Sequence, residues 1–134
     1  MKILAIDDTK TLLSLLCLTL RNAGHEVASA ENGEEGLTTF DEFKPDLVLA
    51  SEQAGPPDAL KRLGDVGVRI VTVPDAPSVD SLKARIRNIA EALDVAPAGD
   101  ALVTEITRDL KAVEAIPATG ARAILVINRT GTLQ

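Results

Sequence analysis

Short apolar segments alternate with amphipathic helical patterns along the chain, and this alternation restricts its possible folds more than any other feature. Apolar runs of strand length occupy residues 3–6, 26–30, 46–50, 68–73 and 123–127. The first run is continuous, which is typical of a strand buried on both faces of a parallel sheet. Strands separated by helices predict a parallel α/β sheet rather than an all-α or all-β fold.

The segments between the first four runs carry helix start and stop signals. Thr9 can cap a first helix, whose apolar residues recur every three or four positions until Gly24. Asn32-Gly33 turns into a polar helix that Pro45 ends. Pro56-Pro57 suits the first turn of a third helix, and we interpret Gly55 before it as part of a turn rather than a phosphate loop, because the motif lacks the Lys-Ser/Thr ending.

Two further helices are expected before the last apolar run. Ser78 can cap a helix whose apolar stripe extends from Val79 to Leu93, a spacing that suits packing on the sheet, with a partner-binding face as the alternative. Pro97-Ala98-Gly99 is expected to interrupt this helix, and Asp100 can cap another. The second half therefore has one helix more than a simple alternation requires.

These elements predict one three-layer, flavodoxin-like domain over residues 1–134. Its five parallel strands would follow the order 2-1-3-4-5, with the extra helix before strand 5. No helix follows the last strand, since only residues 128–134 remain. One sheet face near strand 5 is then covered by the extra helix or left exposed, where it would favour self-association.

Composition and charge exclude several functions. The chain is 46% hydrophobic and 25% charged, and no apolar run approaches the length of a membrane span. The start of the chain reaches acidic residues too soon for a secretory signal, so we expect a cytoplasmic location. Most of the net charge of −6 lies in the first 50 residues, with four basic and nine acidic side chains, which argues against nucleic-acid binding. Cys17, the only cysteine, is expected to be a buried hydrophobe.

Several motifs in the first 49 residues occur together and in order. They are the segments Ile3-Leu4-Ala5-Ile6-Asp7-Asp8, Leu20 to Val27, Ala30 to Leu37 and Lys44 to Leu49. In this order and spacing they resemble a chemotaxis-type response-regulator receiver domain. The resemblance implies that Asp7 and Asp8 hold Mg²⁺ beside a phosphate-accepting aspartate at the end of strand 3. That chemistry needs all three carboxylates.

The rest of the receiver site is not retained. The position of the phosphate acceptor falls on Ser51, which has no adjacent base, and the hydroxyl switch residue is replaced near Pro74-Asp75. The family's lysine after strand 5 would fall near Asn128-Arg129. We therefore expect no phosphotransfer. Asp7 and Asp8 would form a weak residual divalent-cation site or, alternatively, a solvated acidic loop before the first helix.

From about residue 45 the sequence is similar to a different family. The segments Asp46 to Pro57, Leu60 to Leu63 and Gly67 to Pro74 resemble the amino-terminal lobe of a periplasmic binding protein of the hemin and vitamin B12 class. This resemblance covers residues 45–134. It implies that residues 100–116 begin the helix joining two lobes. Iron ligation in the family takes His or Tyr side chains, but the chain lacks Tyr and its one histidine, His25, lies in the receiver-like half, so we expect no hemin cofactor.

The two resemblances meet inside strand 3, where both families have nearly the same residues. We interpret the chain as an engineered fold chimera of a receiver-like half, residues 1–49, and a binding-protein-like half, residues 50–134. It would be non-enzymatic, with no required partner or cofactor beyond weak Mg²⁺ binding. The alternative is a natural degenerate receiver domain that acts as a phosphorylation-independent protein-binding module. A monomer is expected, and the alternative is a dimer that exchanges strand 5.

Overall fold

The central element of the fold is a parallel sheet. The computed structural model describes residues 1–55 and 57–126. Four strands pair in the order β2-β1-β3-β4. Their bounds are Lys2–Ile6 for β1, Glu26–Ala30 for β2, Leu47–Ser51 for β3 and Arg69–Val73 for β4. The α/β class, the flavodoxin-like sheet and the order of the first four strands are as predicted.

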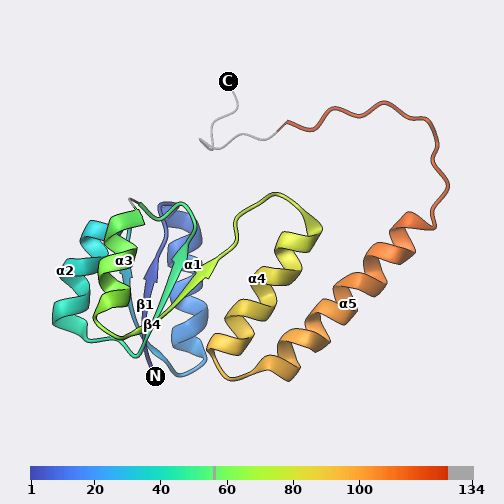
Figure 1. Cartoon of the computed structure of the whole chain (residues 1–134). Helices are drawn as coiled ribbons and strands as arrows, with labels where there is room; N and C mark the ends of the chain where they lie inside the picture. Colours follow the sequence, from blue (N-terminus) through green and yellow to red (C-terminus); the bar gives the residue numbers. More distant parts are fainter. Residues whose placement is uncertain (56, 127–134) are drawn as a thin grey trace.

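Helices cover both faces of this sheet (Figure 1). They are α1 (Lys10–Asn22), α2 (Gly33–Phe43), α3 (Pro57–Asp65), α4 (Val79–Ala92) and α5 (Ala96–Glu114). α2 and α3 pack on one face, whereas α1 and the end of α4 pack on the other. α5 lies outside α4 and packs against it rather than against the sheet (Figure 1). Within the described residues, no helix is both long and apolar enough to cross a membrane.

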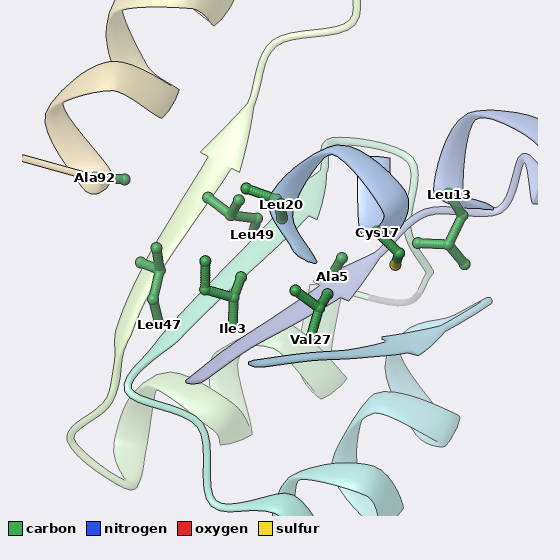
Figure 2. Close-up of a cluster of buried hydrophobic side chains, with 9 residues drawn as sticks. All are labelled: Ile3, Ala5, Leu13, Cys17, Leu20, Val27, Leu47, Leu49 and Ala92. Atoms are coloured by element: carbon green, nitrogen blue, oxygen red, sulfur yellow. The ribbon is translucent and has the colours of Figure 1, made fainter. Parts of the chain in front are cut away.

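Two apolar clusters hold the layers together because strand side chains alternate between the faces. Leu4 and Ile6 of β1 point toward α2 and α3, where they meet Phe40 and Leu63. The other cluster lies under α1 and is drawn in Figure 2; it contains Ile3, Ala5, Leu13, Cys17, Leu20, Val27, Leu47, Leu49 and Ala92. The prediction that Cys17 is a free, buried side chain is confirmed.

The prediction of a fifth parallel strand was wrong for the described residues. Residues 123–126 form no strand, and residue 127 lies outside the described part of the chain. In Figure 1, α4 leads the chain from the carboxyl-end edge of the sheet to the amino-end edge, and α5 leads it back. A segment that follows α5 starts where parallel strands end, so the extra helix inverts the direction that a parallel fifth strand needs.

The boundary between the last two helices also differs from its prediction. The break falls at residues 93–95, where Asp94 adopts a left-handed conformation with φ 59°. Pro97 lies in the first turn of α5, where its missing N–H leaves no hydrogen bond unmade. Gly99 lies inside α5, at its contact with α4, where an added Cβ would collide with the Cβ of Ala90. Asp100 is therefore not a cap, whereas Ser78 caps α4 as predicted, by accepting a hydrogen bond from the Ser81 N–H.

Candidate functional site

The carboxyl-end edge of the sheet brings Asp7 and Ser51 together. The pairing of Ile6 with Ala50 in adjacent strands places the residue after β1 beside the last residue of β3. Both line a cavity of about 340 Å³ between α1 and α4. Both positions therefore lie at the same edge of the sheet, whereas Asp8 is exposed and does not line the cavity.

Most of the cavity wall is apolar. Leu12, Leu15 and Leu16 of α1 face Ile89 of α4 across it, and Val73 closes it at the end of β4. Leu12 and Leu15 are more than half exposed, at 57% and 60%. Such a wall favours apolar groups and offers few ligands to a solvated metal ion.

The acidic pair takes part in local hydrogen bonds of the loop before α1. The Thr9 N–H donates to Oδ1 of Asp7 at 2.8 Å, and the Thr9 hydroxyl donates to Oδ1 of Asp8 at 3.5 Å. Thr9 is the N-cap residue of α1, but its own side chain makes no cap hydrogen bond. Within residues 1–55 and 57–126, no group of three His, Cys, Asp or Glu side chains is arranged to hold a metal ion.

The Ser51 hydroxyl is not hydrogen-bonded to any described group that could activate it as a nucleophile. Its Oγ atom is buried and makes no hydrogen bond. Neither histidine nor lysine lines the cavity among the described residues. No base is therefore hydrogen-bonded to the hydroxyl to accept its proton in the part of the chain that the structure describes.

The sequence did not single out an ion pair at the cavity rim. Arg85 of α4 donates from Nε to the Pro74 carbonyl at 2.9 Å, and its Nη2 atom lies 3.5 Å from Oδ1 of Asp75. The Asp75 N–H in turn donates to Oε2 of Glu52 at 3.4 Å. The spacing of Arg85, three residues after Leu82, places it near the apolar stripe of its helix and could have indicated this role.

The remaining candidate residues lie elsewhere. The Nδ1 atom of His25 lies 3.3 Å from the amino terminus, at the edge of the sheet opposite the cavity. Gly55 precedes α3 in a turn with φ 126°, as expected. Pro74 follows β4 directly, whereas Asn128-Arg129 lies outside the described residues.

The parallel sheet with strand order β2-β1-β3-β4 and helices on both faces defines a flavodoxin-like α/β fold. The sequence profile described as periplasmic binding protein matches residues 41–132. The chain belongs to the periplasmic binding protein family.

Individual relatives come from two groups of proteins. The substrate-binding lipoprotein YvrC of a Bacillus subtilis ABC transporter is 40% identical over 74 residues, which cover 54% of this chain and 24% of the lipoprotein. The alkaline phosphatase synthesis regulator PhoP of Bacillus subtilis is 40% identical over 48 residues, 36% of this chain and 20% of the regulator. The chain therefore spans about a quarter or less of these curated relatives.

Solved structures show the same two similarities. The periplasmic heme-binding protein BhuT, in complex with two hemes, is 27% identical with a TM-score of 0.57, and the match covers 83% of this chain and 48% of BhuT. The response regulator TrrA of Thermotoga maritima, in complex with Mg²⁺-BeF, is 27% identical with a TM-score of 0.50, covering 57% of this chain and 70% of TrrA. Both expected family resemblances are thus confirmed.

Proposed function

We propose that the chain is a non-enzymatic fold chimera, engineered by joining a receiver-like first half to a binding-protein-like second half inside β3. The observation that carries this proposal is the state of Ser51. It occupies the position of the receiver's phosphate acceptor, its Oγ atom is buried without a hydrogen bond, and the cavity that it lines is mostly apolar. This arrangement supports a domain that keeps the fold of the receiver without its phosphotransfer.

The place of the join is supported by β3 itself. Its residues pair with β1 on one side and with β4 on the other, in continuous register from Leu47 onward. Val48 and Ala50 are fully buried, at 0% exposure. A join within this strand preserves both ladders because the two families have nearly the same residues there. A natural gene that matches residues 1–134 continuously across β3 would contradict the proposal and favour a degenerate receiver domain that binds proteins.

Asp7 and Asp8 could form at most a weak divalent-cation site. Asp7 and Asp8 each have one carboxylate oxygen in a local hydrogen bond, and a third protein ligand is needed for firm Mg²⁺ binding. BhuT binds heme, but the chain has one histidine, at the far edge of the sheet, and no tyrosine. We therefore assign no heme to this chain.

The Ser51→Asp variant tests whether Ser51 occupies the former acceptor position and whether Asp7 and Asp8 form a residual cation site. It restores a third carboxylate beside Asp7. In Mg²⁺ titrations followed by NMR, the variant should bind Mg²⁺ about tenfold or more tightly than the unmodified chain. Ser14→Asp is a matched control, because it adds the same charge on an exposed turn of α1 away from the cavity. Its affinity should equal that of the unmodified chain.

Phosphotransfer is tested on the unmodified chain. Acetyl phosphate with Mg²⁺ should produce no covalent adduct by mass spectrometry, and beryllofluoride should not shift the amide signals of Asp7, Asp8 or Ser51. An adduct that disappears in Ser51→Ala would show that the receiver's activity survives, and would overturn the non-enzymatic assignment.

A further inference from the structure

The segment after α5 exposes three consecutive large apolar side chains. Ile124, Leu125 and Val126 are 92%, 85% and 74% exposed. They belong to the apolar run that the sequence predicts as a strand, and the chain around them has no regular structure in residues 117–126. A contiguous exposed run of this kind marks an interaction site.

β4 is an edge strand with one side unpaired among the described residues. It pairs with β3 on one side, and no strand among residues 1–55 and 57–126 pairs with its other side. The C=O of Val73 faces β3, since it accepts the Glu52 N–H at 3.3 Å. Because backbone groups alternate along a strand, those of Thr72 point to the open side. β4 has one charged residue, Arg69, and no proline, so little prevents another strand from pairing with it.

The side-chain pattern of the exposed segment fits this edge. In an extended conformation Ile124 and Val126 point to one face and Leu125 to the other, so both faces are apolar. β4 likewise contributes Val71 to the cluster under α1 and Ile70 to the cluster under α3. A strand added beside β4 would therefore extend both clusters.

The segment does not pack against the sheet of its own chain, since its three large apolar side chains are exposed. In Figure 1 the chain after α5 arches above α4 and stands clear of the sheet. Residues 115–122 can span at most about 26 Å when extended, enough to project the segment beyond α5. From Ile116 to Val126 the only charge is that of Arg122, so repulsion between copies is small there.

We propose that a second copy of this chain covers the open edge of β4, each copy adding its segment 123–126 to the sheet of the other. Each chain has both the added segment and the open edge of β4. Two copies can therefore pair both edges in a closed twofold dimer. This proposal replaces the monomer expected from the sequence.

Light scattering after size-exclusion chromatography, over a wide range of protein concentration, tests the dimer. The unmodified chain should have twice the monomer mass of 14.1 kDa. The double variant Ile124→Asp, Val126→Asp should have the monomer mass while keeping its far-UV circular dichroism. Val66→Asp places a charge on another exposed apolar residue, 63% exposed after α3, and should remain a dimer.

Thr72→Pro tests the acceptor edge, because it removes an outward N–H and leaves the ladder to β3 intact. It should also give a folded monomer. A monomeric unmodified chain at all concentrations would overturn the proposal, as would a dimer that persists in the double variant. A dimer that persists only in Thr72→Pro would overturn the assignment of β4 as the acceptor.

Discussion

The sheet and the segment after α4 differ sharply in how they use apolar residues. Ile3, Leu4 and Val48 in the strands are completely buried, whereas Ile124 is 92% exposed. Between these extremes, α5 has only Gly99 and Val103 buried, on the side facing α4. The sheet, its first three helices and the end of α4 form the core, whereas α5 packs mainly against α4. Burial, rather than apolar composition, determines which of these residues stabilise the fold.

The largest expected loss of stability comes from a substitution in the core of the sheet. Leu4→Ala removes a side chain with 0% exposure and leaves a cavity between β1 and α2. The free energy of unfolding should fall by about 2–5 kcal/mol in urea denaturation. Val113→Ala removes a smaller apolar side chain at a site 63% exposed on α5, and should change the value by at most about 0.5 kcal/mol. Equal losses in both variants would contradict the comparison.

A middle-sized effect should loosen α5 while leaving the sheet intact. Gly99→Val places side-chain atoms where the Cβ of Ala90 already lies, so the two helices must separate. We expect a cost of about 1–3 kcal/mol, confined to α4 and α5. Hydrogen exchange should show faster exchange in α5 and unchanged protection in β1 and β3. Ala101→Val, at an exposed position of the same helix, is the control.

The smallest expected loss of stability comes from substitutions at the N-caps of α1 and α2. The Asn32 side chain accepts a hydrogen bond from the Glu35 N–H at 2.9 Å, while the Glu35 carboxylate accepts one from the Glu31 N–H. Asn32→Ala should lower the free energy of unfolding by about 1 kcal/mol. Thr9→Ala should lower it by less, since the Thr9 side chain makes no cap hydrogen bond. Thermal unfolding monitored by circular dichroism measures both, and a larger loss for Thr9→Ala would show that the loop bonds matter more than the cap.

The sequence predicted the sheet well because its information there is local. Continuous apolar runs and stop signals such as Gly24 mark four strands and three helices within a residue or two. The direction of the chain after α4 is not local, since it depends on whether Pro97 and Gly99 break a helix or start one. Position 99 must be glycine because the Cβ of Ala90 in α4 lies against it. No pattern along the chain reveals this contact between two helices.

The part of the site that follows from local sequence signals could be predicted, whereas the part set by packing could not. Asp7 and Ser51 end neighbouring strands, so strand order alone places them together. Arg85 reaches the rim from a helix whose tilt against the sheet is set by packing, and its partner Asp75 lies in the loop between β4 and α4. The hydrogen bonds of the acidic loop depend on backbone geometry at Thr9, which residue types do not specify.

The central position of β3 has a consequence for the order of events during synthesis. β1 and β2 can pair as soon as the first 30 residues are free, but the other side of β1 has no partner until residues 47–51 follow. β3 in turn needs β4 to complete its own ladders. The first half of the chain therefore leaves the ribosome with an unpaired strand edge, and its protection from aggregation depends on how quickly translation delivers the second half.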